Sequence, residues 1–63
     1  MIDRFLRRPD VQAATGLAKA TIYLRIKEGT FPRPIPVGKR AVAWRESDVK
    51  AWQQQQLDRA TPA

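Results

Sequence analysis

The side chains best suited to binding chemistry in this 63-residue chain are its cations, because twelve Lys and Arg residues face only six acids. Guanidinium and ammonium groups bind phosphate oxygens, and a net charge of +6 on so small a protein is typical of a nucleic-acid binder. The cations gather in three groups: Arg4, Arg7 and Arg8; Lys19 and Lys27; and Lys39 with Arg40. Any one group alone is what an ordinary solvated surface carries, whereas the second and third together predict contacts with phosphates.

Catalytic chemistry finds few candidate residues. The chain has no His and no Cys, which removes the commonest general base, the thiolate nucleophile and the commonest metal ligands. Glu46 and Asp48 are the closest pair of acids, but acids are expected at a helix start, where they face the positive end of the dipole. Gly16, Gly29 and Gly38 are isolated and form no phosphate-binding loop. The sequence therefore predicts a protein that is not an enzyme and needs neither a cofactor nor a metal.

Length and hydropathy place these cations on one small domain. Residues 1–57 are predicted to form that domain, and residues 58–63 a disordered tail. No apolar run approaches the roughly 18–20 residues of a membrane span, and no secretory signal is visible, so we expect a cytoplasmic protein. Composition alone leaves a ribosome-associated or lipid-facing basic domain as the alternative to a nucleic-acid binder.

Two short helices joined by a tight turn are predicted in the first half of the chain. The first covers residues 9–14 and is followed by Gly16, which suits a left-handed helix end. The second covers residues 19–28 and ends at Gly29. A pair of short helices around a glycine-containing turn is the arrangement of a helix-turn-helix.

The second helix is predicted to have one buried and one exposed face. At 100° per residue, Ile22 and Ile26 share the face that would pack on the first helix, and Leu17 would fill the angle between the two helices. The exposed face carries Lys19, Ala20, Tyr23, Leu24 and Lys27. Tyr23 at its edge could pack half-buried or donate its hydroxyl to a phosphate.

A stiff crossing and a hairpin are predicted next. Three prolines at alternate positions within residues 31–36 exclude a helix there. Residues 35–37 and 41–44 flank a basic tip containing Lys39 and Arg40, which predicts a β-hairpin whose proline-containing strand lies at an edge. Near the N-terminus, residues 3–7 would form a short strand or an extended arm.

A third helix is predicted from Arg45 onward, with its end frayed somewhere within residues 53–57. Trp44 and Trp52 could stack on single-stranded nucleic acid, but Val49 shares a helix face with Trp52 and so small a core needs their apolar bulk. We therefore predict that both tryptophans belong to the core. The predicted fold is mainly α with a small β-hairpin wing, an α+β winged helix-turn-helix of about three helices.

Five segments together form a recognisable pattern: Thr15-Gly16-Leu17, Thr21-Ile22-Tyr23, Gly29-Thr30-Phe31-Pro32-Arg33-Pro34, Gly38-Lys39-Arg40-Ala41-Val42-Ala43-Trp44 and Glu46-Ser47-Asp48-Val49-Lys50-Ala51-Trp52. Across residues 4–57 the chain resembles the AlpA family of prophage regulators, which is similar to the excisionases and to MerR-like winged helix-turn-helix domains. The proline crossing combined with the strand that ends in Trp44 is the specific part of the likeness. Two positions depart from it, because relatives usually carry Ser in place of Ala18 and often a basic residue in place of Leu24.

The resemblance implies a sequence-specific duplex-DNA-binding transcriptional regulator of a prophage or integrated element. Its second helix would enter the major groove, with the contacts made by Lys19, Ala20, Thr21, Tyr23 and Lys27. The hairpin tip, Lys39 and Arg40, would touch the flanking backbone or the minor groove, and Arg8 and Arg33 would contact phosphates.

Two alternatives stay open from the sequence. An excisionase, or recombination directionality factor, would bend DNA at an attachment site through the same contacts. A small protein-interaction module of the antitoxin-like kind would instead present its basic face and an exposed Leu24 to an acidic partner. Beyond duplex DNA, the expected partners are further copies of the chain bound cooperatively on repeated sites, and an integrase.

Overall fold

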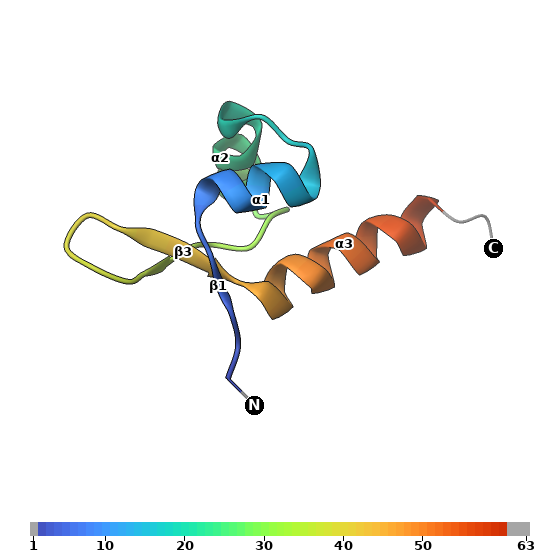
Figure 1. Ribbon diagram of the computed structural model, residues 1–63. Coiled ribbons are helices and arrows are strands. Elements are labelled where there is room, and N and C mark those ends of the chain that lie inside the picture. The colour runs from blue at the N-terminus through green and yellow to red at the C-terminus, as the bar shows by residue number, and fades with distance from the viewer. Residues whose placement is uncertain (1, 61–63) are drawn as a thin grey trace.

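The computed structural model describes residues 2–60, which form three helices and a small antiparallel sheet (Figure 1). In chain order the elements are β1 (Phe5–Leu6), α1 (Arg8–Thr15), α2 (Lys19–Glu28), β2 (Ile35–Pro36), β3 (Val42–Arg45) and α3 (Glu46–Ala60). The helix pair α1–α2 lies on one side of β3, and α3 continues directly from the end of that strand. This arrangement confirms the predicted α+β class and is compatible with a winged helix-turn-helix.

The sequence of the first turn explains why α1 ends where it does. Pro9 lies in the first turn of α1, and Gly16 ends the helix in the left-handed conformation, with φ of 74°. The Thr15 hydroxyl donates to the Val11 carbonyl at 2.7 Å and accepts the Leu17 N–H at 3.3 Å. These two bonds hold the turn in one shape, so α1 leads into α2 at a fixed angle.

Helix α2 lacks a side-chain cap at its start and has a glycine cap at its end, as predicted. Ala18 precedes it without a side-chain hydrogen bond to the first turn, because a methyl group cannot accept one. Gly29 ends the helix with φ of 81°, and its N–H donates back to the carbonyls of Arg25 and Ile26.

Strand β3 is the centre of the sheet, with β1 on one side and β2 on the other. Pro36 of β2 lies opposite Val42, so its missing N–H falls on an edge strand, as expected. Leu6 of β1 lies opposite Trp44, which shows that the N-terminal segment is a strand of the sheet. We call residues 35–45 the wing, because β2, β3 and their connecting turn project from the body of the protein (Figure 1).

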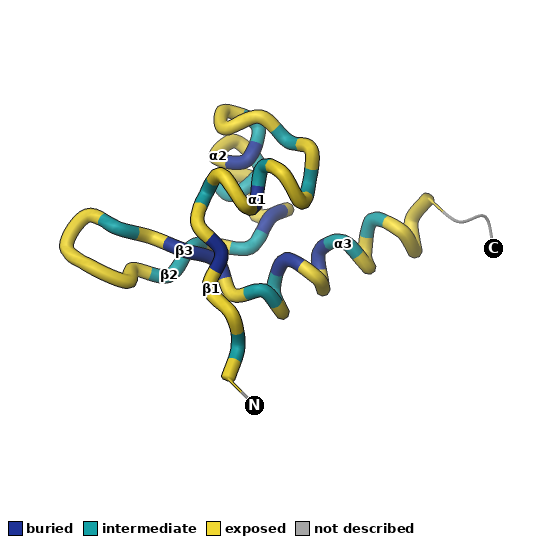
Figure 2. The backbone as a smooth tube through the Cα atoms, viewed as in Figure 1, coloured by how far each residue is buried: buried dark blue, intermediate teal, exposed yellow. Residues whose placement is uncertain are grey.

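The core lies where α1, α2, β3 and the first half of α3 converge (Figure 2). Its buried side chains are Leu6, Val11, Ile22, Phe31, Trp44, Val49 and Trp52, with Leu17 and Ile26 packed against them. The predicted roles of Leu17, Ile22 and Ile26 are therefore confirmed.

Both tryptophans also hold the proline crossing in place. The Trp44 Nε1–H donates to the Pro32 carbonyl at 2.9 Å, and the Trp52 Nε1–H donates to the Thr30 carbonyl at 3.1 Å. The Phe31 and Trp52 rings meet edge to face with their centroids 5.0 Å apart. Because the two indoles are buried and bonded in this way, they have no free face on which a nucleic-acid base could stack.

Helix α3 is longer than the sequence predicted. The expected fraying within residues 53–57 is wrong, because the helix continues to Ala60. Glutamine is a good helix former, the Gln54 amide donates to the Asp58 carboxylate at 2.9 Å, and the Gln53 amide donates to the Ala14 carbonyl at 3.1 Å. Residues 58–60 are thus helical, and the rest of the predicted tail, residues 61–63, lies outside the described residues.

The start of α3 is capped by a residue far away in the sequence. The Asp3 carboxylate accepts hydrogen bonds from the Ser47 N–H and the Ser47 hydroxyl, and the Glu46 N–H donates to the Arg4 carbonyl at 2.7 Å. These bonds, chiefly the one from the Ser47 hydroxyl, lower the pKa of Asp3 below its ordinary value of 3.8. The N-terminal segment therefore fixes the direction in which α3 leaves the sheet.

Replacing Asp3 with Asn should lower the urea midpoint of unfolding at pH 7 and remove one component of its pH dependence. The native pKa lies below the unfolded pKa, so the contribution of Asp3 is complete above about pH 4 and is lost as the pH falls through the native pKa. Urea titrations of both proteins between pH 2.5 and 7 measure the difference, which should shrink on acidification. A difference that stays constant across this range would contradict the role of the charge.

Candidate nucleic-acid interface

The outward face of α2 carries the side chains that the sequence predicted there. Lys19, Ala20 and Lys27 are exposed, while Thr21 is half-buried. Tyr23 is 41% exposed, so it is accessible on this face. Ile22 on the opposite face is fully buried, so the helix cannot rotate without losing its core contact. The exposed face of α2 is therefore held in a fixed orientation.

Leu24 is the apolar exception on this face. Its side chain is 56% exposed, next to Tyr23 and three residues before Lys27. An isolated exposed leucine is common on protein surfaces, so exposure by itself assigns it no role.

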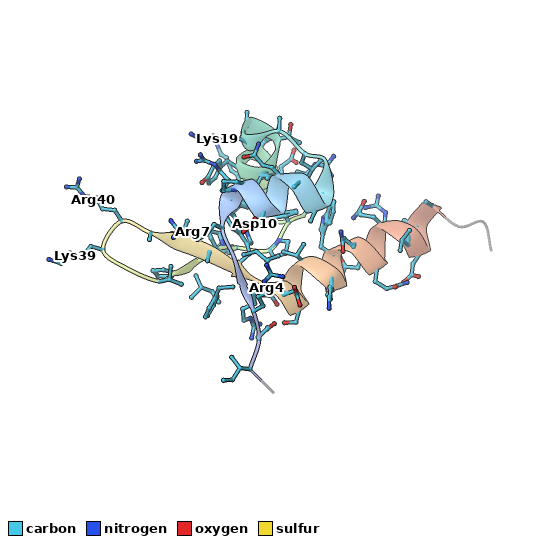
Figure 3. The ribbon with its side chains drawn as sticks, viewed as in Figure 1. Arg4, Arg7, Asp10, Lys19, Lys39 and Arg40 are labelled. Atoms are coloured by element: carbon cyan, nitrogen blue, oxygen red, sulfur yellow. The ribbon has the colours of Figure 1, made fainter. Side chains whose placement is uncertain are left out.

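The tip of the wing is basic and exposed. Lys39 and Arg40 are both exposed in the turn between β2 and β3, and their side chains extend into solvent (Figure 3). The turn is narrow because the Val37 N–H donates to the Ala41 carbonyl at 2.9 Å, which continues the strand pairing up to the tip. The two cations are therefore carried on a structured hairpin.

A second basic region lies between α2 and the wing. The hollow there is lined by Arg7, Arg8, Pro9, Tyr23, Arg40 and Val42, which come from the start of α1, the middle of α2 and the wing. Arg8 and Tyr23, predicted separately as contacts, thus share one surface with Arg40 of the wing tip. Arg7 belongs to the same surface and was absent from the predicted set, although its position beside Arg8 was the available signal.

The ion pairs of the described residues gather around the start of α3. Within residues 2–60, the ion pairs all involve the acids at the start of α3: Arg4 with Glu46 at 3.8 Å, Lys50 with Glu46 at 3.4 Å, and Arg45 with Asp48 at 2.9 Å. Across the same described residues, none of these pairs includes a cation of α2, of the wing tip or of the start of α1. No ion pair within residues 2–60 therefore holds these cations away from an external anion.

Arg33 occupies a different place from the other predicted contacts. It is exposed on the proline crossing. It follows the Thr30 and Pro32 carbonyls, which accept hydrogen bonds from the two tryptophans, and it precedes β2. Its contact with a phosphate stays a prediction.

Other kinds of site are not visible in the described part of the chain. Residues 2–60 contain no group of three or more His, Cys, Asp or Glu side chains placed to hold a metal ion. None of the helices there combines the length and the apolar character needed to cross a membrane.

Comparison with known proteins agrees with the resemblance seen in the sequence. The family description of the prophage CP4-57 regulatory protein (AlpA) matches residues 4–57. The DNA-binding transcriptional activator AlpA of Escherichia coli (strain K12) is 40% identical over 55 residues, which cover 78% of this chain and 79% of that protein. A protein of Enterobacteria phage P4, ORF88, is 46% identical over 50 residues, which cover 79% of this chain but only 57% of the phage protein.

The match therefore includes both helices of the helix-turn-helix, the proline crossing, the wing and most of α3. Such coverage leaves no large part of the described fold outside the likeness. The chain belongs to the AlpA family of prophage regulatory proteins.

Proposed function

We propose that this protein is a sequence-specific duplex-DNA-binding transcriptional regulator of a prophage or integrated element. The observation that carries the proposal is that the cations of α2, the wing tip and the start of α1 lie outside every ion pair within residues 2–60. The K12 relative, named as a DNA-binding transcriptional activator, supports the same function.

In the proposed complex, α2 enters the major groove. Its ten residues make a helix of about 15 Å, and the groove is about 12 Å wide, so about two turns can lie against base edges. Lys19 and Lys27 would donate to guanine O6 and N7 or to phosphates, and the Ala20 methyl would meet a thymine methyl. Thr21 and Tyr23 would add hydroxyl contacts at the rim of the groove.

The wing would hold the protein in register on the duplex. Lys39 and Arg40 would contact the flanking backbone or the minor groove, and Arg8 and Arg33 would contact phosphates nearer to α2. The crossing that joins α2 to the wing is held by the two indole hydrogen bonds, which makes the distance between the two contact regions nearly constant. A rigid spacing of this kind favours one register over its neighbours.

We propose that this regulator acts in the cytoplasm, on the DNA of the nucleoid. One α2 helix offers few base contacts, so we propose that further copies bind cooperatively on repeated sites and that an integrase is a partner in that setting. Excisionase activity would use the same surface but would bend the DNA, which makes bending the property that separates the two roles.

Selection of bound duplexes from a random pool, followed by footprinting and a bending assay, tests this function. We expect one enriched motif of a few base pairs, a repeated arrangement, and a shifted motif when Lys27 is replaced with Ala. Binding without bending would support a regulator, and strong bending would favour the excisionase. A failure to enrich any duplex would contradict DNA binding and favour the protein-interaction module, for which the exposed Leu24 provides a contact.

A further inference from the structure

The hollow between α1, α2 and the wing differs in charge from two other hollows within residues 2–60. It measures about 430 Å³ and is lined by Arg7, Arg8, Pro9, Tyr23, Arg40 and Val42, a set with three guanidinium groups and no carboxylate. The hollow beside β1 and α1 includes Asp10 and Glu46, and the one beneath Phe31 includes Asp48. Only an anion would balance the charge that lines the hollow containing Arg8 and Arg40.

Arg8 provides a second, independent observation. Its Nε atom is buried and has no hydrogen-bond partner within the described structure. Buried polar atoms nearly always have a hydrogen-bond partner, and a buried donor without one is unfavourable. An anion in the hollow that drew the Arg8 guanidinium toward it would supply the missing acceptor. A guanidinium offers five N–H donors in a planar fork that matches a phosphate group.

Tyr23 adds a hydroxyl donor from a different element. Tyr23 is 41% exposed and lines the hollow, so its phenol is accessible to a bound anion. The hollow therefore joins donors from the start of α1, the middle of α2 and the turn of the wing. An anion held there would lie between residues of all three segments.

We propose that this hollow binds one phosphodiester group of the DNA backbone, at the point where the strand passes from the α2 contacts to the wing contacts. Arg8 is the central ligand, Arg7 and Arg40 flank it, and the Tyr23 hydroxyl donates to the same phosphate. The proposal rests on the proposed function, because it names the backbone of duplex DNA as the source of the phosphate. Its role is to set the register of α2 along the groove.

Three single variants test the site, each with a duplex enriched by the wild-type protein. Arg8→Met removes the guanidinium and keeps an apolar stem, Arg8→Lys keeps the charge without the fork, and Arg59→Met removes an exposed cation near the end of α3 as the matched control. We expect affinity to fall roughly tenfold or more for Arg8→Met and less for Arg8→Lys, with Arg59→Met close to wild type. The salt slope should fall by about one for Arg8→Met. Thermal unfolding followed by circular dichroism identifies any variant that fails to fold.

Neutral methylphosphonate linkages, placed at one position of the duplex at a time, locate the phosphate. Wild type should lose affinity strongly at one position between the major-groove contacts and the wing contacts, and Arg8→Met should show no further loss there. Equal losses in the two proteins at every position would overturn the site while leaving DNA binding intact. If wild type bound no duplex in a salt-dependent manner, both the site and the proposed function would fail.

A titration with inorganic phosphate distinguishes binding of a free anion from binding of the DNA backbone. The Arg8 Nε–H resonance in a ¹⁵N-labelled protein should shift when the enriched duplex is added and shift far less with millimolar inorganic phosphate. A full shift with inorganic phosphate alone, together with unchanged duplex affinity for Arg8→Met, would overturn the assignment to the backbone.

Discussion

Replacing Trp44 with Ala is expected to remove about a third or more of the protein's stability at 25 °C. The side chain is fully buried at the centre of the sheet, and its removal leaves a cavity and an unpaired Pro32 carbonyl. Removing a buried Trp costs about 3–5 kcal/mol, whereas a chain of this length has a total stability of about 3–9 kcal/mol. Urea titration followed by circular dichroism at 222 nm measures the loss.

Two further variants separate packing from hydrogen bonding. Trp44→Phe keeps most of the ring volume and loses the donor to Pro32, so it should retain a cooperative transition at a lower urea midpoint. Trp52→Phe makes the same change at the donor to Thr30. A Trp44→Ala protein with the wild-type midpoint would show that the crossing does not depend on this indole.

Replacing Lys39 and Arg40 together with Ala should weaken binding to every duplex by a similar factor. Both side chains are exposed at the wing tip and lie outside every ion pair within residues 2–60, so the fold should be unaffected. Loss of two phosphate contacts predicts a salt slope smaller by about two and an affinity roughly 10- to 100-fold lower at 0.1 M salt. Fluorescence anisotropy with several unrelated duplexes measures both quantities.

The matched control for the wing removes two cations from α3. Lys50 and Arg59 are exposed on that helix, away from α2 and the wing tip, so their joint replacement with Ala should change affinity little. An equal loss in the two double variants would indicate attraction by net charge alone. A loss confined to one DNA sequence would indicate that the wing contacts bases instead of backbone.

The local features of this fold could be predicted from the sequence because each has a short-range cause. Gly16 and Gly29 end the two helices in a conformation that other residues rarely adopt. Pro36 lies on an edge strand because a proline has no N–H to donate to the sheet. Trp44 and Trp52 are buried because so short a chain has few other large apolar side chains with which to form a core.

The long-range features could not be predicted in the same way. Strand β1 is only two residues long, and its register with β3 comes from packing of Leu6 against the core instead of any local pattern. The Asp3 cap on Ser47 joins residues 44 positions apart. The end of α3 was missed because the attachment of Gln53 to the Ala14 carbonyl depends on where α1 lies.

The candidate site also combines features with a local cause and one feature that depends on tertiary packing. The exposed face of α2 and the basic wing tip follow from helical periodicity and a turn signal, and both were predicted. The common hollow of Arg8, Tyr23 and Arg40 was not, because it depends on how closely the wing approaches the helix pair. No local sequence pattern indicates how close the wing lies to the helix pair.

The salt dependence of binding to the enriched duplex tests the proposed interface most directly. The logarithm of the association constant, measured by fluorescence anisotropy from 50 to 300 mM salt, should fall linearly with the logarithm of salt concentration. A slope of about −4 to −5 is expected if about five cations of α2, the wing and the start of α1 neutralise phosphates. A slope near zero would contradict the interface, because cations that displace no counterions are not in contact with the DNA backbone.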